Sequence, residues 1–235
     1  MDIYNRLFVQ GIKPASWEKV FDRAQPSIEL ACKIIEADKR GYIPCLELVF
    51  AAFEYAPLHT VLVVFWGIDP YPNDPTGLAF SCDIRVPKSL EVIYAELKRS
   101  IPGFVIPKHG NLTSWCEQGV LLLNSSLTTA PGVSDAHPGI WTGLAKHVTE
   151  AISDVNSHVV HVGIGVAAQK EAAKVLPPDF RILKIPHPSP RNARGGFVGS
   201  DCFLKINIAL TNAGKKPINW HLPTDPLPPL VDFSL

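Results

Sequence analysis

Four short apolar runs constrain the fold of this chain more than any other feature of the sequence. They lie at residues 60–66, 120–123, 159–162 and 181–185, and stretches with apolar residues at helical spacing separate them. Short apolar runs that alternate with amphipathic helices are typical of a parallel sheet covered by helices on both faces. The sequence therefore predicts an α/β fold, a single α/β/α domain with a central four-stranded parallel sheet flanked by helices.

The length of 235 residues fits one such domain, and no repeat or linker divides the chain. We expect a helical N-terminal part over residues 1–58, the sheet and its loops over 59–220, and an irregular, proline-rich tail over 221–235. Within the first part, the spacing of the apolar residues predicts a helix that begins at Pro26 and ends near Arg40.

The composition excludes a strongly basic protein. Lys and Arg number 22, and so do Asp and Glu, so any contact with nucleic acid would be local. The five cysteines contain no CxxC pair, which favours buried thiols in a reducing compartment over a metal site or a disulfide framework. The N-terminus shows no secretory pattern, and no apolar run is long enough to span a membrane. We therefore expect an intracellular protein.

The segment 67–76, Gly-Ile-Asp-Pro-Tyr-Pro-Asn-Asp-Pro-Thr, directly follows the most apolar run. Its prolines fix φ and remove backbone donors, so we expect a stiff loop. A stiff loop with a carboxylate at the carboxyl end of a buried strand is typical of a ligand site in α/β proteins. The same residues also suit a plain β-to-α connection, because Asp and Pro favour turns. From this segment alone both interpretations stay open.

Polar residues or glycines follow all four predicted strands. Asp69 follows the first strand, Asn124 the second, Gly163 and Gly165 the third, and His187 the fourth. Because the carboxyl ends of parallel strands lie at one edge of a sheet, we expect these residues to face one crevice. This convergence favours a functional site over a plain connection.

The side chains near this edge offer a set of complementary chemical groups. Asp69 can orient or deprotonate a water molecule. Asn124 presents a donor and an acceptor in one plane, which suits the amide-like edge of a base. His187 can donate a hydrogen bond to developing negative charge. Phe80 offers a face for stacking, and Ser189 with nearby main-chain amides suits a phosphate oxygen.

Seven segments, taken together, resemble the motifs of the family 1 uracil-DNA glycosylases. They are GIDPYP at 67–72, GLAFS at 77–81, PKSL at 87–90, LLLN at 121–124, AQK at 168–170, HPSP at 187–190 and GKKPINW at 214–220. Their order and spacing agree with the family over roughly residues 60–220. The resemblance implies a monofunctional glycosylase that needs no metal and no cofactor.

The resemblance also implies roles for individual residues. A uridine is flipped out of the DNA stack, since its glycosidic bond is inaccessible inside the duplex. Phe80 would stack on the uracil, Asn124 would read its N3–H and O4, and Tyr71 would exclude the methyl group of thymine. Asp69 would stabilise the cationic sugar and orient the water. A neutral His187 would donate to uracil O2.

Further positions are implied to contact the DNA, and several depart from the family. Pro87, Ser89 and Ser189 match DNA-binding positions, and Arg191 stands where the family has an intercalating leucine. Ile68, at a substrate-binding position, replaces a glutamine and cannot make its side-chain hydrogen bond.

Two more departures reduce the expected contacts with phosphate. Pro72 replaces a histidine and Val166 replaces a serine. The departures at 68, 72 and 191 resemble the poxvirus branch of the family, in which the enzyme also serves in a processivity complex. A replication-associated protein partner is therefore part of the expectation.

Three functions remain open at this point. The first is a monomeric enzyme that acts on uracil in single- and double-stranded DNA. The second is a catalytically weak, glycosylase-like DNA-binding subunit of a replication complex, which the intact Asp69, Asn124 and His187 disfavour. The third is a small-molecule hydrolase that uses Asp69 and His187. It leaves the segments 87–90 and 189–191 unexplained, and no nucleophile elbow is present.

Overall fold

A parallel sheet of four strands forms the centre of the protein, as the sequence predicts. The computed structural model describes residues 2–9, 13–190 and 195–226. The strand order is β2-β1-β3-β4, and every neighbouring pair is parallel. The strands are β1 (Val63–Gly67), β2 (Val120–Asn124), β3 (Val160–Ile164) and β4 (Ile182–Ile185). The first strand begins later than expected, because Leu58–Thr60 form a turn of 3₁₀ helix, η3.

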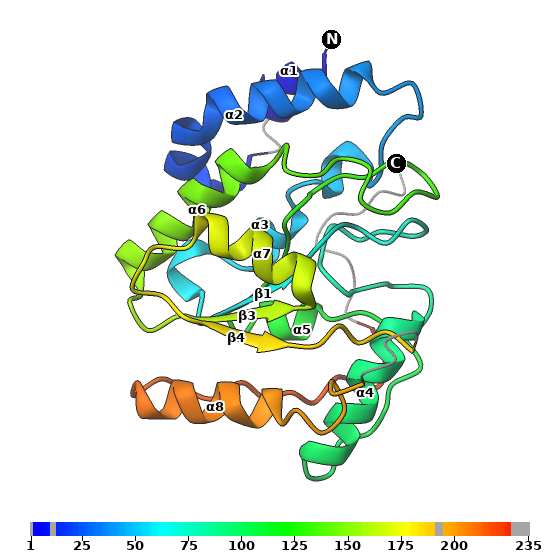
Figure 1. The fold of residues 1–235 in the computed structure, drawn as a ribbon, viewed down its shortest axis with the longest axis vertical. Helices are drawn as coiled ribbons and strands as arrows, with labels where there is room; N and C mark the ends of the chain where they lie inside the picture. Colours follow the sequence, from blue (N-terminus) through cyan, green and yellow to red (C-terminus); the bar gives the residue numbers. More distant parts are fainter. Residues whose placement is uncertain (1, 10–12, 191–194, 227–235) are drawn as a thin grey trace.

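Helices cover the sheet on both sides (Figure 1). On one side lie α2 (Glu18–Ala37), α6 (Thr142–Val155) and α7 (Val166–Val175), and on the other lie α4 (Lys88–Ser100) and α8 (Cys202–Asn212). The shorter helices are α1 (Ile3–Val9), α3 (Ala51–Tyr55), α5 (Thr113–Cys116) and the 3₁₀ turns η1 (Ala15–Trp17) and η2 (Leu46–Leu48). This arrangement is the predicted α/β/α domain.

Aromatic side chains pack between the sheet and α8. The ring centroid of Phe65 in β1 lies 6.3 Å from that of Phe203 in α8 and 6.0 Å from that of Trp220. Trp220 also meets Trp115 of α5 edge to face at 5.4 Å. Burial of a side chain of this size contributes about 1.5–3 kcal/mol, so this layer holds β1 firmly in place.

Helix α2 differs from the sequence prediction. It runs over Glu18–Ala37 and contains Pro26 in its interior, whereas the prediction began the helix at that proline. Proline inside a helix removes a hydrogen bond and costs about 3 kcal/mol. The buried Phe21, Ala24 and Ile28 continue one apolar face across the exposed Pro26, and the helix packs against α6. Burial of this face outweighs the cost of the proline.

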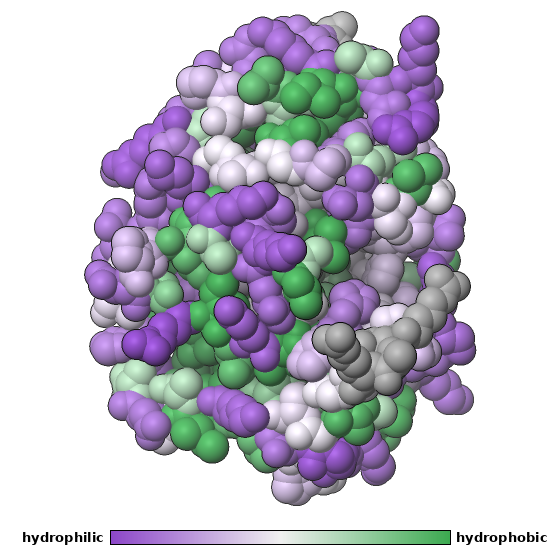
Figure 2. All heavy atoms as spheres, in the orientation of Figure 1, coloured by the Kyte–Doolittle hydropathy of each residue, from purple (hydrophilic) through white to green (hydrophobic). Residues whose placement is uncertain are grey.

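The face of the molecule in Figure 2 carries hydrophilic residues with smaller hydrophobic areas between them. No helix in the described ranges has the length and apolar character needed to cross a membrane.

Candidate active site

One pocket lies at the carboxyl edge of the sheet, the edge to which the arrowheads of β3 and β4 point in Figure 1. This edge pocket encloses about 590 Å³, including its open mouth. Its lining brings together the predicted residues Asp69, Asn124 and His187. The full lining comprises Gly67, Ile68, Asp69, Pro70, Tyr71, Pro72, Phe80, Ser89, Asn124, Ser134 and His187.

Main-chain hydrogen bonds join the loop after β1 to the loop after β2. The amide of Ser125 donates to the carbonyl of Gly67 over 3.1 Å, and the amide of Ser126 donates to the carbonyl of Ile68 over 2.7 Å. The Ser125 hydroxyl donates to the same Ile68 carbonyl over 3.0 Å. These bonds extend the β1–β2 pairing beyond the strands, so Asp69 leaves the sheet from a fixed backbone.

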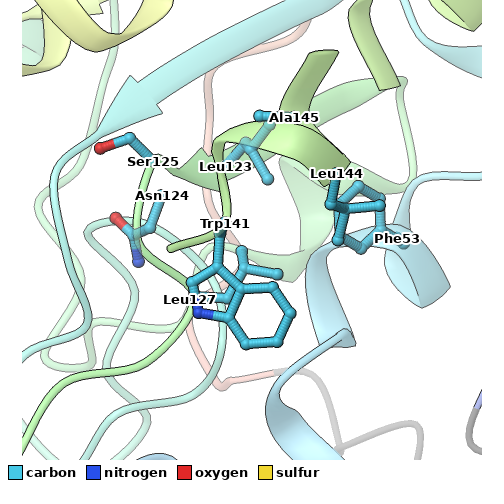
Figure 3. A pocket seen from close by; sticks show the side chains of 8 residues that line it. All are labelled: Phe53, Leu123, Asn124, Ser125, Leu127, Trp141, Leu144 and Ala145. Atoms are coloured by element: carbon cyan, nitrogen blue, oxygen red, sulfur yellow. The ribbon is translucent and has the colours of Figure 1, made fainter. Parts of the chain in front are cut away.

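Asn124 is the last residue of β2 and is buried. Its backbone partner across the sheet is Gly67, and a side chain at 67 would overlap the Asn124 carboxamide oxygen. Behind Asn124, the side chains of Leu127, Trp141 and others form an apolar pocket from which its carboxamide points away (Figure 3). Within the described part of the chain no hydrogen bond uses this carboxamide. Its donor and acceptor can therefore pair with a ligand in the edge pocket.

Asp69 is partly buried, and one of its carboxylate oxygens has a main-chain partner. The amide of Asp135 donates to Oδ2 of Asp69 over 2.5 Å. Burial raises the pKa of Asp69, the Asp135 amide lowers it, and the charge of Asp135 raises it, with a net increase. The carboxylate is therefore oriented, and it is more basic than an exposed aspartate.

Tyr71 forms one wall of the edge pocket, and its hydroxyl is fixed from two sides. The oxygen lies 2.7 Å from the hydroxyl of Ser89, and the Tyr71 hydroxyl donates to the carbonyl of Phe80 over 3.3 Å. Burial raises the pKa of Tyr71 to about 12, so the phenol is neutral at physiological pH. The ring is thus a rigid, uncharged surface.

Phe80 lines the same pocket and has a left-handed backbone, with φ of 66°. This conformation is strained for a bulky residue and persists only where the surroundings hold it. The amide of the preceding Ala79 donates to the carbonyl of Leu122 in β2 over 3.0 Å, and Tyr71 holds the Phe80 carbonyl. A strained aromatic residue at a pocket is typical of a functional position.

His187 follows β4 and is partly buried. Burial lowers its pKa, so the imidazole is neutral at physiological pH and can donate one hydrogen bond. Gly165, with φ of 85°, lies beside it, and a Cβ at 165 would come 3.0 Å from the Cβ of His187. The glycine after β3 therefore makes room for the histidine after β4.

Three of the four predicted DNA-binding residues, Pro87, Ser89 and Ser189, belong to segments that supply residues to the pocket lining. Pro87 is buried and immediately precedes α4, and Ser89 in the first turn of that helix faces the pocket through its contact with Tyr71. The amide of Ser189 donates to the carbonyl of His187 over 2.8 Å, which forms a tight turn. Arg191 lies outside the described residues.

Sequence analysis missed the loop 129–137. Ser134 lines the pocket and Asp135 contacts Asp69, but the sequence indicates only a loop here, with Pro131-Gly132 inside the segment and Pro138-Gly139 just after it. Its position after β2 is the only signal that could have indicated a role. Among the described residues, no three His, Cys, Asp or Glu side chains gather as they would around a metal ion.

Comparisons with known proteins agree with this geometry. A sequence model of the Uracil DNA glycosylase superfamily matches residues 53–211. Uracil-DNA glycosylase from Deinococcus deserti is 39% identical over 220 residues, which cover 89% of this chain and 88% of the relative. The Vibrio parahaemolyticus enzyme is 43% identical over 192 residues, or 80% of this chain and 84% of the relative.

Solved structures show the same relationship. The crystal structure of mimivirus uracil-DNA glycosylase matches with a TM-score of 0.79 and 28% identity, over 88% of this chain and 86% of the other. The fold and the edge pocket thus define a DNA glycosylase. The chain belongs to the uracil-DNA glycosylase superfamily.

Proposed function

We propose that the edge pocket binds a flipped-out deoxyuridine of DNA and hydrolyses its N-glycosidic bond. The reaction releases uracil, leaves an abasic site and thereby initiates base excision repair. One observation carries this proposal: a carboxylate, an amide and a neutral imidazole from three different strand ends, Asp69, Asn124 and His187, line a single pocket beside Phe80.

Asn124 reads the base. Its carboxamide oxygen accepts from uracil N3–H and its NH₂ group donates to O4, while Phe80 stacks on the ring. Cytosine presents the reversed pattern of donors and acceptors, which would leave buried polar groups unpaired. A site built on such hydrogen bonds rejects the wrong base strongly.

Tyr71 excludes thymine. Its ring packs against C5 of the base, where thymine carries a methyl group. Because the hydroxyl is held by Ser89 and by the Phe80 carbonyl, the ring cannot rotate away to admit that methyl.

Asp69 and His187 divide the chemical step between them. The bond between C1′ and N1 breaks with its electron pair on uracil, and the neutral His187 donates a hydrogen bond to uracil O2. The ionised Asp69 stabilises the cationic sugar and orients the water that attacks C1′. The water oxygen stays on the sugar, and uracil leaves as the free base after it takes up a proton.

Contacts with the DNA backbone are local in this proposal. Pro87, Ser89 and Ser189 approach the phosphates, and Arg191 replaces the intercalating leucine. We assign the chain to family 1 of the superfamily, with poxvirus-like residues at Ile68, Pro72 and Arg191. A replication-associated partner follows from that likeness, and co-purification with a DNA polymerase would test it. The substrate places the enzyme in a compartment that contains DNA.

A cleavage assay tests the function. Oligonucleotides with one uracil, single- or double-stranded, are incubated with the protein and treated with alkali, which breaks the strand at abasic sites. The wild-type protein is expected to produce scission only at uracil. Asp69→Asn is expected to bind the DNA but to lose about 10²- to 10⁴-fold in turnover. No scission by the wild-type protein, with a related glycosylase active alongside, would refute the proposal.

A further inference from the structure

The loop 129–137 is hydrogen-bonded at two places to residues 67–76, the loop after β1, which we call the catalytic loop. Besides the bond from the Asp135 amide to the Asp69 carboxylate, the amide of Gly132 donates to the carbonyl of Pro72 over 3.3 Å. Asp69 and Asp135 are 66 positions apart in the sequence. The loop after β2 therefore contributes directly to the environment of the catalytic carboxylate.

Asp135 occupies a strained backbone conformation, with φ of 53°. Asp and Asn tolerate the left-handed region better than other residues with a side chain, but it still stores strain, which is common at functional sites. The neighbouring residues hold the turn in place. The Thr129 hydroxyl donates to the carbonyl of Val133 over 2.6 Å and accepts from the amide of Ala136 over 3.2 Å.

The far end of the loop is anchored in the core through the buried His137. Its Nδ1 lies 3.0 Å from the Thr128 hydroxyl, and its Nε2 lies 3.2 Å from Oδ2 of Asp38, just after α2. Hydrogen bonds from Arg40 hold the pKa of Asp38 well below its usual range, so Asp38 stays ionised. The Ser126 hydroxyl donates to the His137 carbonyl over 2.6 Å. These contacts fix the position at which Asp135 meets Asp69.

We propose that Asp135 is a second acidic residue of the active site: its amide orients Asp69, and its carboxylate adds negative charge where the sugar becomes cationic. This inference rests on the proposed glycosylase function. Asp135 thus has two separable effects, one through its main-chain amide and one through the charge of its exposed side chain.

The charges around Asp69 support the second effect. Asp135 is the titratable residue whose charge raises the pKa of Asp69, after the larger effect of burial. The other titratable residues in the pocket lining are Tyr71, from the loop after β1, and His187, after β4; both are neutral at physiological pH. The loop after β3 and the first turn of α4 present Gly165 and Ser89, which carry no charge.

Asp135→Asn separates the two effects, because asparagine keeps the main-chain amide and tolerates the left-handed backbone. We expect kcat to fall about tenfold, the size of the attraction between two opposite unit charges about 12 Å apart at an effective dielectric of 20. KM is not expected to rise, since a negative charge is removed near DNA. The acid limb of the kcat/KM profile should move to lower pH, because Asp69 loses a neighbouring charge.

Two further variants complete the design. Asp135→Gly removes the side chain and relieves the strain but keeps the amide, so it should match Asp135→Asn in its pH profile. Asp179→Asn is the control for loss of an acidic charge. Asp179 is exposed, just before the amino end of β4 at the opposite edge of the sheet, and its substitution should change nothing.

A ¹³C NMR titration of the Asp69 carboxyl measures the effect of the Asp135 charge and does not depend on an activity assay. The carboxyl should titrate at lower pH in Asp135→Asn than in the wild-type protein. Equal titration curves, together with unchanged kcat and an unmoved acid limb, would overturn the proposal. A shifted Asp69 titration in a protein without uracil release would instead refute the glycosylase function and, with it, the catalytic role of Asp135.

Discussion

The hydroxyl oxygens of Tyr71 and Ser89 lie 2.7 Å apart and connect the catalytic loop to the first turn of α4. The family resemblance places Ser89 among residues that contact DNA, and the structure adds a contact inside the pocket. Ser89→Ala should therefore loosen the Tyr71 ring as well as weaken DNA contacts. The loss of one hydrogen bond, about 1 kcal/mol, predicts a fall of about fivefold in kcat/KM on uracil-containing DNA.

The matched variant for this prediction is Ser89→Thr, which keeps the hydroxyl. Ser89→Thr should keep most of the activity that Ser89→Ala loses. If both variants lose activity to the same extent, the hydrogen bond from residue 89 to Tyr71 does not account for the loss in Ser89→Ala.

Tyr71→Ala should give the enzyme a new activity on thymine. Without the ring, the pocket gains space beside C5 of the base, and the thymine methyl no longer clashes. The measurement is release of labelled thymine from DNA with a T·G mismatch. Tyr71→Phe, which keeps the ring, should release none; thymine release by both variants, or by neither, would contradict exclusion by the ring.

Gly67→Ala should damage uracil recognition. A Cβ at 67 would overlap the Asn124 carboxamide oxygen, so the Asn124 side chain would have to shift from its position in the lining of the edge pocket. We expect kcat/KM to fall by at least tenfold, as for loss of a paired group in a buried site. A double-mutant cycle with Asn124→Ala checks the mechanism, because the two losses should not add. Additive losses would mean that Gly67 acts through another contact.

Glu96 should contribute to stability, and the contribution should depend on pH. Its carboxylate is fully buried in α4, and it accepts from the amides of Gly199 and Asp201 over 2.7 and 2.8 Å and from the Arg99 guanidinium. Burial raises the pKa of Glu96, but these hydrogen bonds outweigh it, and the net pKa is lowered. Glu96→Gln removes the buried negative charge, while the half-exposed Arg99 keeps Asp201 as a partner, so about 2 kcal/mol should be lost at pH 7, the size of a hydrogen bond to a charged group.

The sign of the pH effect follows from the lowered pKa. The stabilisation is fully present above the pKa of an unfolded glutamate, about 4.3, and it is lost as pH falls through the folded pKa. Urea unfolding of both proteins at pH 7 and at lower pH measures it. The difference in unfolding free energy between the wild-type protein and Glu96→Gln should shrink in acid. A difference that does not change with pH would mean that the stabilisation comes from packing and not from the charge of Glu96.

DNA binding should depend weakly on salt. None of the described residues that line the edge pocket is Lys or Arg, and the formal net charge is +0. Each neutralised phosphate adds about 0.9 to the slope of log K against log salt, so we expect a slope of about −3 or shallower. Fluorescence anisotropy with Asp69→Asn and uracil-containing duplex gives this slope. A value near −6 would require a basic surface beyond the pocket.

The architecture could be predicted from the sequence because buried strands and helices have recognisable local patterns of apolar residues. The residues of β1 and β2 are all buried, and such strands read as continuous apolar runs. Parallel strands also bring their carboxyl ends to one edge, so Asp69, Asn124 and His187 were expected near one another, and they line one pocket. Their chemical roles remain predictions. Helix α2 was misread at Pro26, because a local rule about proline was weighed without the packing that overrides it.

The sequence by itself determined the fold class, the family and the positions of the polar strand ends. Only the tertiary structure decided which groups surround them. The bond from Asp135 to Asp69 depends on a left-handed backbone and on residues far apart in the chain, and neither leaves a periodic pattern. The contact of Tyr71 with Ser89 likewise exists only because the sheet and α4 are packed together. Local patterns record burial and turns, whereas contacts between distant loops arise from the packing of the whole domain.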